Sequence, residues 1–303
     1  MTSRCLLLGA IALALTAGCG SRARTVAPVS PAWRSIAATL AGPLQPRSAN
    51  ACNRGAPACV AAVVAEMQAR LDALTAACDH KAAFALMYLR VTQAVERATS
   101  SATATAGDRA YLAHLDAVFA QLYFKAYDAW AAGDQRVVPD AWQLAFTTAE
   151  RRRVSGIGDL LLGMNAHISR DLPFAVAAVG LGSGSNAERR RRSFEGVNGI
   201  LRDIAPRMLR EESRRFDPTV AHFTLPVLKT DEGSLALLLS RWRDAALRDG
   251  RRLLDAATPA RRAAVARSIE RNAVARAVVI AAATSRVPFS SAGRARDAFC
   301  RAH

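Results

Sequence analysis

The sequence predicts an all-α protein, a single bundle-like domain of helices built around a kinked central helix. Apolar residues recur every three or four positions through most of the chain after residue 57, which is the spacing of one helix face. No segment shows the alternation of apolar and polar residues that is typical of a half-buried strand. The chain that follows residue 18 is long enough to bury one large core or two small ones.

Residues 1–18 predict a cleaved export signal. Arg4 supplies a positive start, and residues 6–15 form an apolar run that is too short to span a bilayer as a stable helix. The stretch LTAGC, which ends at Cys19, resembles a lipoprotein signal, although Thr16 stands where leucine is usual. We therefore expect lipid on Cys19 to hold the domain at a membrane surface, with ordinary signal cleavage as the alternative.

The rest of the chain divides into a tether and a domain. Residues 19–56 contain several prolines and little periodicity, so we expect a lipid-anchored tether there and an all-helical domain over residues 57–303. The apolar run 274–283 is about half as long as a membrane-spanning helix, so no later segment is expected to cross a membrane.

The net charge of +16 comes almost entirely from arginine. Heavy use of arginine together with alanine is typical of a GC-rich genome, and attraction to anionic components of the cell envelope is the functional interpretation. The densest arginine runs, 151–153 and 189–192, flank loop-like sequence and carry no interleaved aromatic residues. Nucleic acid is therefore not an expected partner.

Four cysteines remain once the signal and the acylated residue are set aside. In an oxidising compartment they predict two disulfides, with three possible pairings. Cys52 and Cys59 lie close together in a loop that contains proline and glycine, which makes them natural partners. Cys78 would then pair with Cys300 and staple the C-terminus to the first helical hairpin. A zinc site is the rival interpretation, but it lacks a CxxC pair.

Local signals place the helices of the first half. Pro57 is a favoured first residue, so the first helix begins there. We expect the second helix to start at Asp79 as its N-cap, with His80 on its apolar face, and the third to follow Asp108. A shorter helix is expected over residues 139–147.

The long apolar segment 155–180 is the predicted central helix. Polar residues interrupt it, and Pro173 is expected to kink it, because proline removes the hydrogen bond to the carbonyl of Ser169 and so frees backbone oxygens. The glycines and serines of residues 182–186 predict a flexible loop before the second arginine run.

Two helices are expected to close the domain. Before them, a helix over 194–204 is predicted to end near Pro206, and residues 216–233 are predicted to be irregular. The final pair covers 234–256 and 258–283, and a threonine N-cap followed by proline opens its second member.

The pair His167 and Asp171 is the most informative candidate site. Residues four apart on a helix share one face, and Asp171 lies at the edge of an apolar stripe. A buried carboxylate needs a partner, which would be a metal ion, the His167 ring or an arginine from another helix.

Three interpretations of this pair stay open. A buried His–Asp hydrogen bond would lock the helix into the core, two ligands would bind one divalent metal ion, or the pair would perform metal-free acid–base chemistry. Asp116 and Asp128 are further candidates, although a solvated helix face also explains them. Three other histidines are candidates to converge on this site, although each alone is also explained as a core or surface residue: His80, His114 and His222. No nucleophile elbow, Walker loop, dinucleotide fingerprint or HExxH motif occurs.

Three blocks of the sequence, residues 84–92, 115–124 and 163–173, resemble a bacterial family of all-helical proteins that is a domain of unknown function. The third block reads GMNAHISRDLP, and the family pattern is close to GMNAHIN-x-DLP. It departs from that pattern at Ser169, where asparagine is usual. Weaker matches follow at residues 194–201 and 241–246.

The resemblance spans about residues 78–204 and implies a helical fold with a polar cluster of Asn165, His167 and Asp171, joined by Asp116. It implies no reaction. The remaining histidines are not part of the pattern, which weakens any site made of histidines alone.

The leading interpretation is an exported envelope lipoprotein with a small polar pocket on the kinked helix, used as a metal-dependent hydrolase. His167 and Asp171 would hold a divalent metal ion or act as base and orienter, and Asn165 would position substrate or water. The alternative is a non-catalytic helical scaffold or binding module, whose His–Asp pair is structural and whose basic surface meets anionic envelope components.

Overall fold

The computed structural model describes residues 57–101, 106–222, 232–285 and 289–302. The predicted signal and tether, and with them Cys19 and Cys52, lie outside the described residues. The prediction of an all-α domain is confirmed: the described part contains helices and no strand, apart from an isolated bridge between Val154 and Ser285. No helix in this part is long and apolar enough to cross a membrane.

The first half of the described part contains four α-helices: α2 (Pro57–Ala76), α3 (Ala82–Ser100), α4 (Ala106–Ala132) and α5 (Asp140–Glu150). The N-cap position of the second is Lys81, two residues later than the expected Asp79. The Asp79 carboxylate accepts the backbone N–H of Lys81 at 2.9 Å, within the turn that precedes α3. The buried face of α3 carries Phe84, Met87 and Tyr88 into the core.

The predicted central helix lies in the middle of the molecule. It consists of α6 (Gly156–Asn165), a six-residue π-helical turn η3 (Ala166–Asp171) and α7 (Leu172–Val179). Every residue of α6 and α7 is buried, and the three segments contact α3, α4, α5 and two later helices. The helix is irregular just before Pro173, where its turn is widened. In this turn the backbone N–H of Leu172 donates to the carbonyl of His167, five residues earlier.

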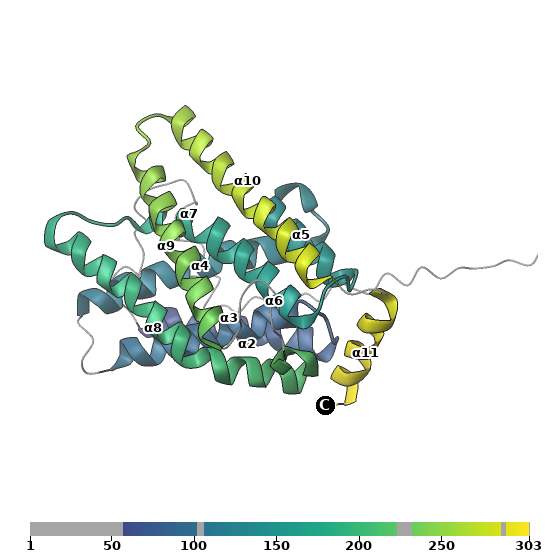
Figure 1. Cartoon of the computed structure of the whole chain (residues 1–303). Helices are drawn as coiled ribbons and strands as arrows, with labels where there is room; N and C mark the ends of the chain where they lie inside the picture. Colours follow the sequence, from purple (N-terminus) through teal and green to yellow (C-terminus); the bar gives the residue numbers. More distant parts are fainter. Residues whose placement is uncertain (1–56, 102–105, 223–231, 286–288, 303) are drawn as a thin grey trace, which may run out of the picture.

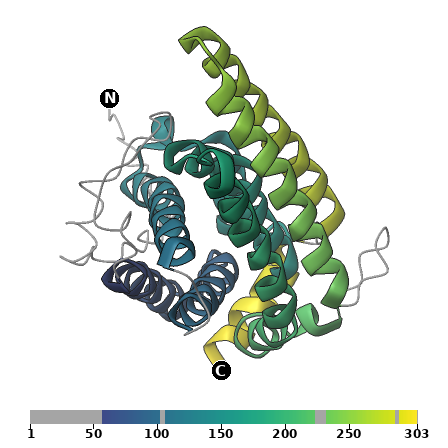
Figure 2. The ribbon, with the colours of Figure 1, turned by 90° about the vertical axis from the view of Figure 1, so that its left-hand side faces the viewer.

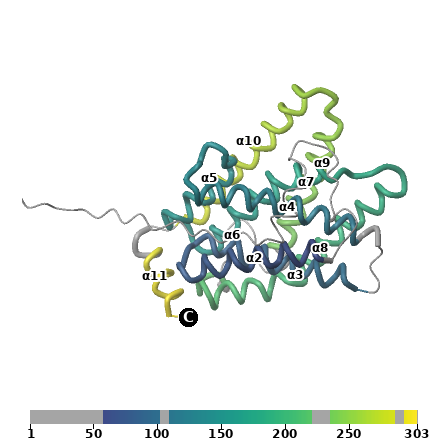
Figure 3. Tube along the Cα trace, turned by 180° about the vertical axis from the view of Figure 1, so that it is seen from behind, coloured from purple at the N-terminus to yellow at the C-terminus, as the bar shows by residue number. Residues whose placement is uncertain are grey.

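Two expectations for the segment after the central helix are wrong. Helix α8 (Gly184–Arg215) already includes most of the predicted loop, and it continues through Pro206. Proline inside a helix costs about 3 kcal/mol. The helix survives because its apolar face continues on both sides of the proline and packs against α3, with these residues buried: Phe194, Val197, Leu201, Ala205 and Met208. Figure 3 shows α2, α3 and α8 running together along one side of the molecule.

The expected final pair is present as α9 (Glu232–Asp255) and α10 (Pro259–Thr284). The Thr258 side chain accepts the N–H of Arg261 at 3.2 Å, so the predicted N-cap is confirmed. The two helices form an antiparallel hairpin whose connecting turn projects beyond the other helices (Figures 1 and 2). A short 3₁₀ turn, η4 (Pro218–His222), follows α8 in the segment that was expected to be irregular.

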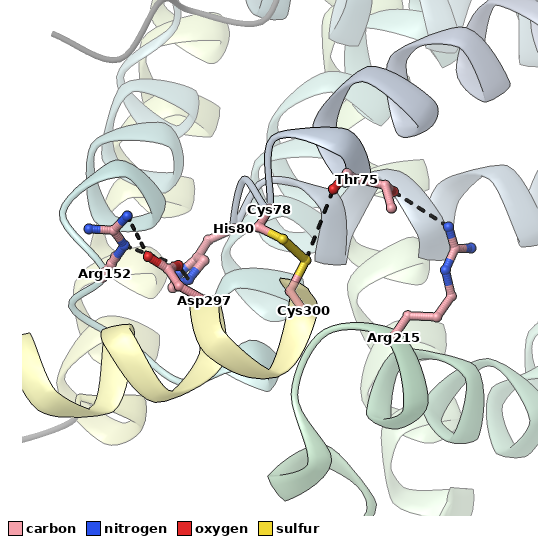
Figure 4. The surroundings of a disulfide bond; sticks show 7 residues. All are labelled: Thr75, Cys78, His80, Arg152, Arg215, Asp297 and Cys300. Carbon is pink, nitrogen blue, oxygen red and sulfur yellow. Dashed lines mark hydrogen bonds and ion pairs between the residues drawn. A yellow bond between two sulfur atoms is a disulfide. The ribbon is translucent and has the colours of Figure 1, made fainter. Parts of the chain in front are cut away.

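A last helix, α11 (Phe289–Ala302), was not expected. It lies at the edge of the molecule (Figure 1) and is joined to the turn after α2 by a disulfide between Cys78 and Cys300 (Figure 4). This is one of the two predicted pairings. The other, Cys52 with Cys59, falls on residues that the structure does not fully describe.

Candidate functional site

His167 and Asp171 lie side by side on the π turn, in the interior of the molecule. The distance from Nδ1 of His167 to Oδ2 of Asp171 is 3.4 Å, and their side chains are 2% and 0% exposed. The spacing of four residues therefore brings the two side chains together, at the long end of hydrogen-bond distance.

Asp171 has two closer partners. The indole Nε1 of Trp142, on α5, donates to Oδ2 at 2.8 Å, and the guanidinium of Arg170 donates to Oδ1 at 2.8 Å. Arg170 also pairs with Glu270 on α10 at 2.9 Å. The carboxylate is thus satisfied mainly by an adjacent arginine and a tryptophan, whereas the sequence suggested a metal ion, the His167 ring or an arginine from another helix. The sequence signal was Trp142 itself, because a buried indole N–H needs an acceptor.

The His167 ring is enclosed by aromatic side chains from three helices. Phe119 stacks on it with 3.5 Å between ring centroids, and the Tyr88 ring lies 4.1 Å away. Trp142 and Phe84 complete the enclosure at 6.1 and 5.6 Å. Burial lowers the pKa of His167, and the hydrogen bond and charge of Asp171 only partly oppose this effect. The imidazole is therefore neutral at pH 7.

A neutral ring in this position fixes the roles of its two nitrogens. Nδ1 carries the proton and faces Asp171, since a carboxylate accepts and does not donate. Nε2 of His167 is then an acceptor, and it has no hydrogen-bond partner within the described part of the chain. The hydroxyl of Tyr88 is buried and unpartnered in the same way.

Asn165 points to a different neighbour. Its amide nitrogen donates to the carbonyl of Ala273, on α10, at 2.8 Å, while its Oδ1 is buried without a partner. Asn165 therefore ties α6 to α10. Its described contacts do not include His167 or Asp171.

Asp116, on α4, is half-buried, and its Oδ2 atom is buried without a hydrogen-bond partner in the described part of the chain. Burial, with a smaller contribution from the charge of Glu96, raises the pKa of Asp116 to about 7. Its charge also raises the pKa of Tyr88, so Asp116 lies on the Tyr88 side of the cluster. Among the described residues, no three histidine, cysteine or acidic side chains are arranged to hold a metal ion. The structure therefore gives no support to the three-ligand set of His167, Asp171 and Asp116.

The other candidates lie in separate environments. Asp128 pairs with the buried Arg70 at 2.9 Å. His114 has its pKa lowered to about 4 by burial and by the charge of Arg190. His80 is bound to Asp297 of α11 at 3.1 Å. The side chain of His222 lies outside the described residues, so the histidines that the structure places do not converge on His167.

The sequence did not reveal an ionic cluster that holds α11. Arg296 binds Asp159 at 2.7 Å and Asp217 at 3.3 Å, and Asp297 binds both His80 and Arg152. Figure 4 shows Asp297 between Arg152 and His80, close to the disulfide. The only signal in the sequence was the mixed pattern of residues 289–302, which is helical in its spacing but strongly polar.

Two of the clefts on the described surface are wide enough to consider as sites, and neither is lined by His167 or Asp171. One lies between α9 and α10 beside the π turn, and the other lies between α3 and α8. The His167 cluster is closed, whereas a substrate must reach the reacting groups of an enzyme.

Comparison with known proteins gives one match. A family model described as a family of unknown function (DUF5995) matches residues 60–283. No curated protein and no solved structure matches the chain.

Proposed function

Because the chain belongs to DUF5995, a family of unknown function, we propose a role from its own residues: a lipid-anchored binding module of the cell envelope whose His167–Asp171 pair is structural. This is the second of the two functions that the sequence suggested. The enclosure of the pair carries the proposal, because both side chains are buried and aromatic rings pack around His167.

The pair has a clear structural task. A π turn is an irregular segment, and its backbone needs neighbours that hold it in place. Trp142 and Arg170 bind the Asp171 carboxylate, and Arg170 continues to Glu270, so the cluster links the π turn to α5 and α10.

The expected partner is an anionic surface. The net charge is +16, but the run 189–192 is not a free basic patch, because Arg191 pairs with Glu195 and Arg192 with Glu188. At the projecting end of the α9–α10 hairpin, three arginines are exposed and make no ion pair with a described residue: Arg248, Arg251 and Arg261. An exposed basic tip is suited to anionic lipid headgroups.

Vesicle binding tests the proposal. The mature chain carrying Cys19→Ser, which removes the lipid, is mixed with phosphatidylglycerol vesicles and with phosphatidylcholine vesicles and then sedimented. We expect binding to the first only, and at least a tenfold loss when Arg248, Arg251 and Arg261 are all changed to glutamine. Glutamine at Arg189, Arg191 and Arg192 is the matched control. Equal losses in both triple variants, or equal binding to both vesicles, would contradict the proposal.

One observation favours a second candidate, the metal-dependent hydrolase. Three buried atoms have no partner among the residues that the structure places: His167 Nε2, Asp116 Oδ2 and the Tyr88 hydroxyl oxygen. Such atoms are uncommon in folded proteins. Metal analysis of the purified mature protein separates the two functions. A stoichiometric ion that is lost in His167→Ala would favour the hydrolase, whereas a metal-free protein whose His167→Ala variant keeps wild-type vesicle binding favours the binding module.

A further inference from the structure

The cleft between α9 and α10, called here the hairpin cleft, lies directly outside the π turn. Its volume is about 310 Å³, at the lower end of the range of roughly 300–1,000 Å³ that small-molecule sites occupy. Its polar and aromatic lining comes from three elements: Ser169 of η3, Trp242 and Asp249 of α9, and Asn272 and Arg276 of α10. Alanines form the rest of the wall, so side chains do not fill the space.

Arg276 is a half-buried cation with neutral neighbours. Its guanidinium donates to the Ser169 hydroxyl and lies over the Trp242 ring, 5.2 Å from the centroid. No carboxylate lies within ion-pair distance of Arg276 in the described part of the chain. Burial lowers the pKa of Arg276, which reflects the cost of a charge withdrawn from water, and the charge of Asp249 only partly offsets it. An anionic group in the hairpin cleft would remove this cost.

Asp249 supplies the opposite charge to the same cleft. One of its oxygens, Oδ1, binds Arg252 at 2.8 Å, and that arginine is about half exposed. Asp249 and Arg276 act on one another electrostatically, but they are not in contact as an ion pair. The hairpin cleft therefore presents a cation and an anion that are separated by open space.

The π turn connects this cleft to the closed cluster. The turn directs His167 and Asp171 into the core, while Ser169, between them in sequence, lines the hairpin cleft and accepts from Arg276. The buried cluster thereby holds one wall of the cleft in position, which is the preorganisation that a binding site needs.

We infer that the hairpin cleft binds a small zwitterion with a free carboxylate and a protonated amine, of the amino-acid class. The carboxylate would bind Arg276 and Asn272, the ammonium group would bind the free side of Asp249, and the aliphatic part would lie against Trp242. This site goes beyond the proposed function and does not depend on it, because neither the lipid anchor nor the basic tip takes part.

Three probes that share the leucine side chain and carry different charges test the inference. L-leucine carries both charges, N-acetyl-L-leucine carries only the carboxylate, and L-leucinamide carries only the amine. Each is titrated to about 10 mM into mature protein with ¹⁵N-labelled tryptophan, and the indole N–H signal of Trp242, assigned with Trp242→Phe, is followed by NMR. We expect a saturable shift with L-leucine, at least tenfold weaker binding of the other two probes, and unmoved signals from Trp130 and Trp142.

Paired variants identify the charged groups. We expect Arg276→Gln and Asp249→Asn each to weaken L-leucine binding at least tenfold. Arg271→Gln and Asp244→Asn, which lie on the same two helices and do not line the cleft, should leave binding unchanged. The absence of a Trp242 shift in the wild type would overturn the inference, as would equal binding of all three probes or equal losses in the control variants. Binding in the probe series is measured on wild-type protein, and Trp242→Phe serves only to assign the signal, so the series stays decisive even where Arg276→Gln or Asp249→Asn fails to fold.

Discussion

At the scale of single residues, the polar groups in the described core differ in whether they have a hydrogen-bond partner. Asp171 is satisfied by Trp142, Arg170 and His167, so its burial is compensated. Within the described residues, Oδ2 of Asp116 and both carboxylate oxygens of Glu212 are buried without partners, and burial raises the pKa of these two residues to about 7 and about 8. A paired carboxylate stabilises the fold, whereas an unpaired one destabilises it once it ionises.

Removal of Asp171 should be costly. In Asp171→Ala the Arg170 charge and the Trp142 N–H lose their buried partner, so we expect the free energy of unfolding to fall by about 3 kcal/mol or more. Denaturant unfolding measures this, with and without a chelator, beside His167→Ala and the double variant. The control is Asp203→Ala, whose ion pair with Arg202 spans 3.8 Å on the surface and should contribute less than about 1 kcal/mol. A small loss, or coupling that disappears with the chelator, would contradict a structural pair.

The raised pKa of Asp116 predicts that the stability of the folded protein depends on pH. Its pKa is about 7 in the folded protein, above the ordinary aspartate value of 3.8, so between these two pH values the folded state binds more protons than the unfolded state. The contribution of Asp116 to stability therefore falls as pH rises from about 4 to about 7. We expect Asp116→Asn to be more stable than the wild type at pH 8, with a smaller advantage at pH 4. Urea unfolding across this range measures it, with Asp203→Asn as the exposed control, and a difference that does not change with pH would rule it out.

At the scale of elements, two glycines lie where neighbouring helices pack closely on the central helix. Gly163 of α6 lies so close to α3 that an added Cβ would stand 2.5 Å from Phe84. Gly250 of α9 meets Val176 of α7 in the same manner, at 2.6 Å. These two contacts draw α3 and α9 onto the central helix, and α3 brings Phe84 and Tyr88 to the His167 ring.

Two glycine substitutions separate packing from helix propensity. Gly163→Ala should lower the free energy of unfolding by about 1–3 kcal/mol, because the new methyl group meets the base of the Phe84 side chain. Gly196→Ala, within α8, meets no atom within 4 Å and should raise it by roughly 0.5–1 kcal/mol through better helix propensity. Thermal and denaturant unfolding of both variants provide the comparison. Equal effects of the two changes would show that α6 and α3 are not in close contact.

At the scale of the whole molecule, the C-terminal helix α11 is held by a disulfide and ion pairs more than by apolar packing. Its described anchors are the Cys78–Cys300 disulfide and the ion pairs of Arg296 and Asp297, which reach α6, the segment after α8 and the turn before α3. The disulfide joins residues 222 apart, so it closes nearly the whole domain into one loop.

Loss of this disulfide should reduce stability over the whole domain. For a loop of this length the chain-entropy model gives a contribution of roughly 5 kcal/mol. The variant Cys78→Ser with Cys300→Ser should therefore unfold at lower denaturant concentration than the oxidised wild type, with the Ala302→Ser variant as a control on the same helix. Non-reducing peptide mapping checks the bond directly. A free Cys300 in the wild type, or a double variant as stable as the wild type, would contradict this prediction.

The sequence alone determined the features that depend on neighbours along the chain. Periodic apolar residues located the helices, Thr258 marked the start of α10, and four-residue spacing placed His167 beside Asp171. The family resemblance, which the match over residues 60–283 confirms, rested on equally local blocks. These signals are reliable because helix geometry relates residues three and four apart in the same way in any fold.

Only the tertiary structure decided what depends on helices that are distant in sequence. Packing against α3 carried α8 through Pro206, and the crossing of α5 brought the Trp142 indole to Asp171. The approach of α9 to α10 left Arg276 and Asp249 on the walls of one cleft. Contacts of this kind depend on the angles and distances at which helices pack, and these follow from the whole set of side chains in the core, which no single segment of the sequence contains.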